Sequence, residues 1–138
     1  MLDLDRRQVL GTAATLGAAA SLATVEGSWT VTGLQDEDYA LVVTAGGNFT
    51  ATPTDGNPGT SPDPGCPFSG TLTPRPSGKN VFNVTFLTGA SAVDCTYPNE
   101  ASSGVAIAYP VAGGTQLILA VTKNTDRQRG AVVAGLKP

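Results

Sequence analysis

Two segments decide the fold of this chain: Cys66-Pro67-Phe68-Ser69-Gly70-Thr71-Leu72 and, after a short turn, Val81-Phe82-Asn83-Val84-Thr85-Phe86-Leu87. In the second segment Phe82, Val84 and Phe86 share one face, and mostly polar residues occupy the other. Alternation of this kind, with aromatic and branched side chains, indicates a β-strand. Gly78 in the intervening turn tolerates a positive φ. The two segments therefore predict a β-hairpin.

Similar short segments continue on both sides of this hairpin. They lie at residues 26–34, 39–44, 48–52, 104–109, 115–121 and 130–136, separated by turn residues. With the hairpin they make about eight strands, each turning back on its neighbour, which implies an antiparallel meander. We therefore predict an all-β, up-and-down antiparallel barrel of about eight strands. A two-sheet β-sandwich is the alternative fold. Residues 53–65, rich in proline and glycine, are expected to form a long exposed loop.

Composition excludes several classes of function. The chain has 138 residues with 17 glycines, 10 prolines and a net charge of −3, and it contains no basic run of the kind that binds nucleic acid. Histidine is absent, which removes the commonest general base and the commonest nitrogen ligand of metals. We therefore expect no nucleic-acid partner, no metal site and no cofactor.

The N-terminal segment has the features of an export signal. Arg6 and Arg7 precede a weakly apolar run that ends in Ser21-Leu22-Ala23. This run is too short to span a bilayer, so no permanent membrane span is expected. Arg6-Arg7-Gln8-Val9-Leu10 resembles the twin-arginine export signal. The resemblance implies a signal helix at residues 1–23, a single domain at 24–138, and a periplasmic or secreted protein.

The chain has two cysteines, Cys66 and Cys95. In an exported domain two such cysteines are expected to form a disulfide. Their separation is too long for a redox motif of the Cys-x-x-Cys type. The bond is therefore predicted to be structural, holding the hairpin against the connection that follows it.

Gly27-x-Trp29 opens the first strand and resembles the opening motif of the calycins, which include lipocalins, avidins and bacterial barrel inhibitors. In that group the tryptophan plugs one end of an eight-stranded barrel. The resemblance implies that Trp29 is a barrel plug or part of a ligand site, with the binding site at the opposite mouth. A core tryptophan in another β-fold is the alternative.

A second resemblance covers the C-terminal half. It rests on Cys66-Pro67-Phe68-Ser69-Gly70-Thr71-Leu72-Thr73-Pro74-Arg75, on Ser77-Gly78-Lys79-Asn80-Val81-Phe82-Asn83-Val84, and on Cys95. It continues through Gly104-Val105-Ala106 and Leu117-Ile118-Leu119-Ala120-Val121 to Arg129-Gly130-Ala131-Val132. These segments resemble small exported bacterial proteins, often lipoproteins, without an assigned activity. The resemblance implies a disulfide-pinned β-domain and no catalytic residue.

The remaining charged residues suggest little chemistry. The acidic turns at 36–38 and 55–63 lack the spacing of a calcium loop and are expected to be solvated. Nothing in the spacing of Glu26, Asp94 and Glu100 brings two carboxylates together for glycoside cleavage. Lys123, Arg127 and Arg129 are expected to form a solvated face.

The expected function is therefore binding and not catalysis. We expect an exported barrel of uncharacterised activity whose partner is a protein or a small apolar ligand. Two alternatives are an envelope-associated interaction module and an enzyme inhibitor of the calycin type. A large apolar cavity lined by Trp29 would favour ligand binding, whereas an interior filled by side chains would favour the interaction module.

Overall fold

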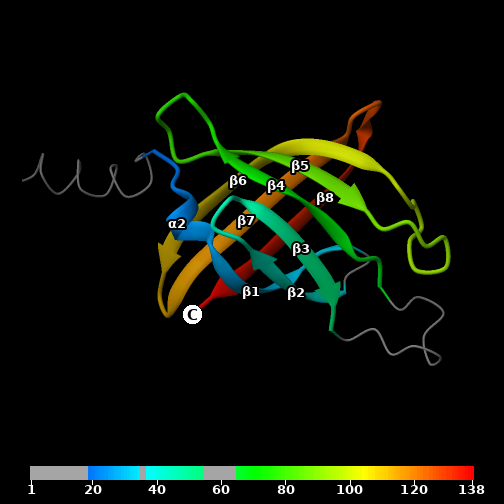
Figure 1. Cartoon of the computed structure of the whole chain (residues 1–138), viewed down its shortest axis with the longest axis horizontal. Helices are drawn as coiled ribbons and strands as arrows, with labels where there is room; N and C mark the ends of the chain where they lie inside the picture. Colours follow the sequence, from blue (N-terminus) through cyan, green and yellow to red (C-terminus); the bar gives the residue numbers. More distant parts are fainter. Residues whose placement is uncertain (1–18, 35–36, 55–64) are drawn as a thin grey trace, which may run out of the picture.

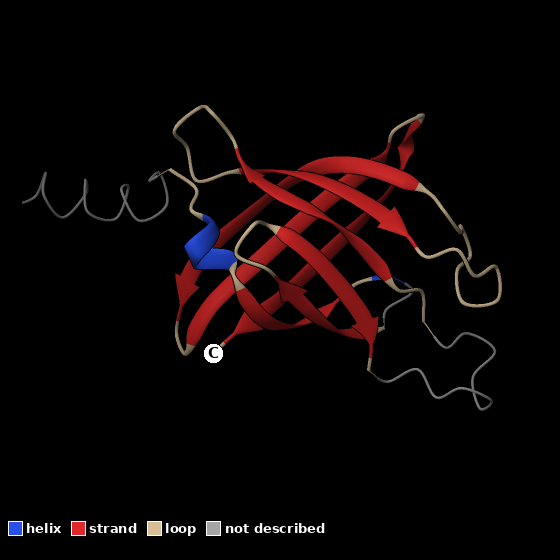
Figure 2. Cartoon of the chain, in the orientation of Figure 1, coloured by secondary structure: helices blue, strands red, loops and turns tan. Residues whose placement is uncertain are grey.

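A computed structural model describes residues 19–34, 37–54 and 65–138 of the chain. These residues form a closed antiparallel barrel whose eight strands follow one another in chain order (Figure 1). The strands are β1 (Gly27–Thr32), β2 (Asp38–Val43), β3 (Asn48–Pro53), β4 (Phe68–Pro74), β5 (Phe82–Thr88), β6 (Ala101–Val111), β7 (Gly114–Lys123) and β8 (Asp126–Lys137). One short helix, α2 (Leu22–Val25), lies beside one end of the barrel (Figure 2).

The barrel closes through the pairing of its first and last strands. β1 pairs with β2 along its whole length and also with β8, where Thr30 lies opposite Leu136. This second pairing leaves neither strand as a free edge, which a sandwich would have required. The predicted barrel is confirmed, and the β-sandwich alternative is wrong.

Side-chain alternation fills the interior. Along β5 every second residue is buried, so Phe82, Val84 and Phe86 point inward as their spacing predicted. Because adjacent residues of a strand face opposite sides, each strand contributes a set of inward apolar side chains. The resulting core contains Trp29, Tyr39, Leu41, Phe49, Phe68, Leu72, Leu117, Leu119 and Val133 among its members. The interior is thus packed by side chains from every strand.

Two glycines allow strands to approach closely. A Cβ atom on Gly70 would collide with the carbonyl oxygen of Thr85 on the neighbouring strand, and one on Gly135 would collide with the carbonyl oxygen of Thr30. Any larger residue at either position would have to push two paired strands apart. Glycine is therefore required where β4 meets β5 and where β8 meets β1.

Strands β6 and β8 begin earlier than the sequence pattern predicts. β6 begins at Ala101 and not at Gly104, while β8 begins at Asp126 and not at Gly130. Apart from Ala101, the additional residues are polar or charged, and they show no apolar alternation, so the periodicity gives no signal there. Their backbones still pair, because Lys123 of β7 lies opposite both Ser102 and Asp126.

The barrel has two different ends. We call the end beside α2, Val25 and Trp29 the capped end, and the end beside Leu34, Thr88 and Glu100 the mouth. Leu22 packs against the core at the capped end, and the backbone amide of Ala20 donates a 3.1 Å hydrogen bond to the carbonyl of Lys79. The segment before β1 is therefore held against the barrel.

The predicted export signal is only partly within the described residues. Arg6 and Arg7 lie outside them, as does most of the predicted exposed loop at 53–65. In the described part of the chain, no helix has the length and apolar character needed to cross a bilayer.

Candidate functional site

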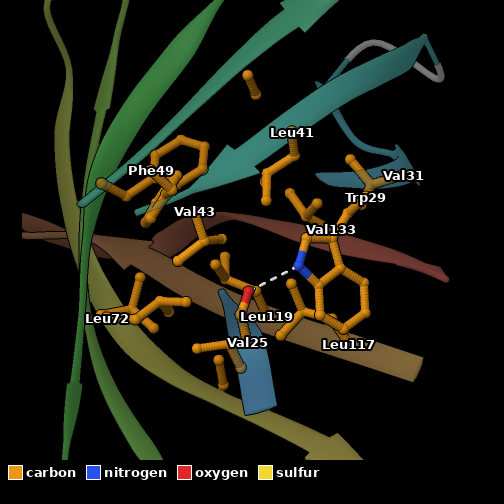
Figure 3. Close-up of a cluster of buried hydrophobic side chains, with 14 of the residues drawn as sticks. Val25, Trp29, Val31, Leu41, Val43, Phe49, Leu72, Leu117, Leu119 and Val133 are labelled. Atoms are coloured by element: carbon orange, nitrogen blue, oxygen red, sulfur yellow. Dashed lines mark hydrogen bonds between the residues drawn. The ribbon is translucent and has the colours of Figure 1, made fainter. Parts of the chain in front are cut away.

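Trp29 lies at the capped end with only 2% of its surface exposed. Its indole Nε1 donates a 2.8 Å hydrogen bond to the carbonyl oxygen of Val25, the last residue of α2. Figure 3 shows the ring among the side chains of Val133, Leu117 and Leu119. This hydrogen bond satisfies the indole N–H, so the ring can be buried without an unpaired donor.

Lys137 of β8 also stabilises the capped end. Its ammonium group donates hydrogen bonds to the carbonyl oxygens of Thr24 at 3.0 Å and Glu26 at 2.8 Å, and it lies 5.1 Å from the centre of the Trp29 ring. Carbonyl oxygens left free at the end of a short helix are satisfied by such a cation. The space around Trp29 is thus filled by side chains and by this helical turn.

The disulfide lies at the mouth. Cys66 and Cys95 are bonded with an S–S distance of 2.05 Å, and both are almost fully buried. Cys66 precedes β4, whereas Cys95 belongs to the connection between β5 and β6. The bond therefore pins that connection across the mouth, as predicted, and it is compatible with an oxidising, exported location.

Next to the disulfide, an ion-pair group crosses the rim of the mouth. Oε1 of Glu100 lies 2.7 Å from Nη2 of Arg129 and 3.4 Å from Nζ of Lys123. The Arg129 guanidinium stacks on the ring of Tyr97, with its carbon 3.4 Å from the ring centre. We call Tyr97, Glu100, Lys123 and Arg129 the mouth cluster. Lys123 and Arg129, expected to belong to a solvated face, are about one-third exposed, and both pair with Glu100.

The Arg129–Glu100 contact is close in distance but not well directed. Nη2 of Arg129 is inaccessible to solvent and makes no hydrogen bond of acceptable geometry within the described part of the chain. Since the 2.7 Å separation is short enough, the direction of the N–H bonds must be unsuitable. The pair is therefore mainly a charge contact.

Thr88 connects the mouth cluster to the barrel wall. Its hydroxyl donates a 2.6 Å hydrogen bond to the carbonyl oxygen of Tyr97 and accepts a 2.8 Å hydrogen bond from the backbone N–H of Glu100. One inward-facing residue of β5 thus fixes two backbone positions of the connection. This network orients Tyr97 and Glu100 over the mouth.

A partly enclosed cavity of about 220 Å³ lies beneath this rim and is called here the mouth pocket. Its apolar lining includes Leu34, Phe86, Ala131 and the disulfide at Cys66. Its polar lining includes Thr96, Glu100 and Ser102. The Phe86 ring is backed by Phe68 at a centroid distance of 4.7 Å, so the floor is rigid.

Two groups of strands present chemically different residues on the outside of the barrel. The outward residues of β1, β3 and β4 are mostly hydroxyl-bearing, and we call them the hydroxyl wall: Ser28, Thr30, Thr32, Thr50, Thr52, Ser69, Thr71 and Thr73. The outward residues of β6, β7 and β8 are mostly apolar, and we call them the apolar wall: Val105, Ile107, Ile118, Ala120, Val132, Ala134 and Leu136.

The apolar wall is continuous across its three strands. Val105 lies opposite Ala120, which lies opposite Val132. A second row of this kind joins Ile107, Ile118 and Ala134. Val132 is 63% exposed, and Val105 and Ile107 are each 38% exposed, so both rows are open to solvent.

The structure describes only part of the two acidic turns that are expected to be solvated. No three residues of the kinds that bind metal ions are grouped among the described residues. Asp38 accepts a 2.9 Å hydrogen bond from the Thr32 hydroxyl across the β1–β2 pair. The acids at 36 and 55–63 lie outside the described residues.

The chain matches no protein-family model, no curated protein and no solved structure at a significant level. The resemblances carried by Gly27-x-Trp29 and by the Cys66–Cys95 region therefore stay predictions.

Proposed function

We propose that this chain is an exported, non-catalytic domain that binds a protein partner through the apolar wall. The observation that carries the proposal is the continuous exposed apolar surface over β6, β7 and β8, of which Val132 is the most exposed large residue at 63%. Contiguous apolar surfaces of this kind on soluble proteins mark contacts with other molecules. The uncharged centre of the wall also fits the composition of protein interfaces.

The packed interior supports a protein partner over a ligand held inside the barrel. Trp29 is enclosed by Val133, Leu117 and Leu119 at the capped end (Figure 3). A ligand reaching this depth would have to displace well-packed side chains, which costs several kcal/mol. We therefore prefer the role of an interaction module to that of a carrier of a small ligand. An inhibitor of a partner enzyme is one form that this function could take.

The non-catalytic part of the proposal is supported by the environment of Glu100. This acid lies at the mouth, but its nearest charged groups are Lys123 and Arg129 and not a second carboxylate. Acid–base cleavage of the glycosidase type needs two carboxylates that face each other, whereas Glu100 is paired with two cations. The arrangement suits a structural clasp better than acid–base chemistry.

The apolar wall can be tested by site-specific photo-crosslinking in the cells that make the protein. A photoreactive phenylalanine derivative is placed at Ile107 on the apolar wall or, as the matched control, at Thr52 on the hydroxyl wall. We expect a discrete crosslinked protein from position 107 and none from position 52. A product at twice the mass of the chain would identify the partner as a second copy.

A charged substitution on the apolar wall provides a second test of the proposed interface. Val132→Lys, at an exposed position, should leave the melting temperature nearly unchanged and abolish the crosslink from position 107. Thr30→Lys on the hydroxyl wall should leave that crosslink intact. Equal crosslinking from both walls, or a crosslink that survives Val132→Lys, would exclude the proposed interface.

The export part of the proposal rests on the N-terminal sequence, and the disulfide is compatible with it. Cleavage after Ala23 would remove the packing of Leu22 and the Ala20 hydrogen bond to Lys79, but it would retain Thr24 and Val25, whose carbonyl oxygens bind Lys137 and Trp29. Mass spectrometry of the exported protein is expected to find Thr24 at its N-terminus. A mature chain that begins at Met1 would refute the proposed cleavage after Ala23.

A further inference from the structure

The mouth pocket is separate from the apolar wall and combines an apolar floor with a single polar corner. Phe86, Leu34 and the disulfide at Cys66 form the apolar part. Glu100 and Ser102 come from the start of β6 and both line the same cavity. A molecule that fills this space therefore needs an apolar body with one polar group.

Ser102 is the first indication that the pocket takes a ligand. Its surface is only 7% exposed, and its side chain points inward from β6, opposite Phe86 of β5. Its hydroxyl makes no hydrogen bond within the described part of the chain, in contrast to Thr88 in the same lining. The hydroxyl oxygen is not among the solvent-inaccessible side-chain atoms that lack a partner, so it can be reached from the pocket and is available to a polar group of a ligand.

The charges around the pocket restrict the polar group of the ligand. Glu100 is the one charged residue among those described around the cavity, and its carboxylate can accept a hydrogen bond from a ligand that carries a donor, which a carboxylate ligand lacks. Its Oε1 already contacts Arg129 and Lys123, which would repel an ammonium group. The other oxygen, Oε2, accepts no hydrogen bond in the described residues. A neutral hydroxyl can donate to Oε2 and accept from Ser102, and it avoids the repulsion by the two cations.

The volume of the mouth pocket limits the size of the apolar part of the ligand. A cavity of about 150 Å³ lined by apolar side chains holds benzene. The mouth pocket, at about 220 Å³, therefore has room for a single aromatic ring with one or two small substituents. Phe86, backed by Phe68 at 4.7 Å, offers a fixed ring against which such a molecule can pack.

We propose that the mouth pocket binds a neutral single-ring phenol or a similar small alcohol. The ring packs against Phe86, Leu34 and the disulfide. The hydroxyl donates to Oε2 of Glu100 and accepts from the hydroxyl of Ser102. Tyr97, which is 53% exposed and belongs to the same lining, covers the outer side of the site.

The test uses four probes of similar size that differ in their polar group: 4-methylphenol, toluene, 4-methylbenzoate and 4-methylbenzylamine. Each is titrated into the folded protein and followed by the amide chemical shifts of the ¹⁵N-labelled chain. We expect 4-methylphenol to bind roughly tenfold or more tightly than the other three, because it alone forms both hydrogen bonds without repulsion. Its shifts should centre on residues 86, 100, 102 and 131.

Two serines that are adjacent in β6 give a matched pair of variants. Ser102→Ala removes the buried hydroxyl and should weaken 4-methylphenol roughly tenfold while leaving toluene unchanged. Ser103→Ala is the control, because Ser103 is exposed and donates to Asn124 at 2.8 Å outside the pocket. Both variants should keep the wild-type melting temperature within a few degrees.

Three results would overturn the proposal. Toluene or 4-methylbenzoate binding as tightly as 4-methylphenol would remove the role of the hydroxyl. Equal losses in Ser102→Ala and Ser103→Ala would remove the role of Ser102. Shifts confined to the apolar wall would place the binding elsewhere. Because the apolar wall is tested by crosslinking, failure of one proposal leaves the other intact.

Discussion

The capped end and the mouth close the same barrel by different means. The capped end is closed by apolar packing and by the hydrogen bond from Trp29 to Val25, four residues away in the chain. The mouth is closed by contacts between distant residues, among them the Cys66–Cys95 bond and the Glu100–Arg129 pair. The first closure leaves the space around Trp29 filled, whereas the second leaves a cavity. Stability is thus expected to come mainly from one end and binding from the other.

The largest loss of stability is expected for a substitution of Trp29 at the capped end. Trp29→Ala removes a buried ring and leaves the Val25 carbonyl without its donor, so it should lower the free energy of unfolding by about 3–5 kcal/mol. Chemical denaturation of the purified protein measures the loss. Trp29→Phe, which keeps a ring but not the N–H, should lose less. A loss below about 1 kcal/mol for Trp29→Ala would show that the capped end does not govern stability.

At the mouth, removal of the disulfide should have the next largest effect. Cys66 and Cys95 are 29 residues apart, and loop-entropy arguments give roughly 3.5 kcal/mol for a bond closing a loop of this size. We expect the Cys66→Ser, Cys95→Ser double variant to unfold at a lower denaturant concentration than wild type. A reducing agent should destabilise only the wild-type protein. If reduction leaves the wild-type midpoint unchanged, the bond does not pin the connection.

The smallest effect is expected at the ion pairs of the mouth. Glu100→Gln should cost about 0.5–1 kcal/mol, because Lys123 and Arg129 are about one-third exposed and water screens the interaction. The difference from wild type should shrink in high salt. Glu26→Gln at the opposite end is the control, since Glu26 is exposed and makes no ion pair among the described residues. An effect at Glu100 as large as that of the disulfide would contradict this ranking.

The sequence predicted the inside of the barrel well and its outside poorly. Phe82, Val84 and Phe86 alternate with more polar neighbours, so the buried face of β5 could be recognised directly. In β6 both faces are apolar, with Ala106 and Ala108 buried but Val105 and Ile107 exposed. Periodicity cannot distinguish the two sides of such a strand. The apolar wall therefore became visible only when the pairing of β6, β7 and β8 was known.

The mouth was hidden from the sequence for a different reason. Glu100 and Arg129 are separated by two strands and two turns, and no local spacing connects them. The apolar alternation begins only at Gly104, so the sequence pattern leaves Ser102 outside the predicted strand, yet Ser102 belongs to β6 and is 7% exposed. Tertiary pairing decided both positions. By contrast, the disulfide could be predicted without knowledge of the fold, since two cysteines in an exported chain allow one intramolecular bond.

The pairing of β1 with β8 also determines when the protein can fold during its synthesis. β1 is made early, but one of its two neighbours is β8, whose last residue is Lys137. Until that strand has left the ribosome, β1 and β7 each keep an unpaired edge, and Trp29 and Val25 lack the lysine that holds the helical turn. Partial chains therefore carry open strand edges that could aggregate. The barrel is expected to form as one unit after β8 has been synthesised.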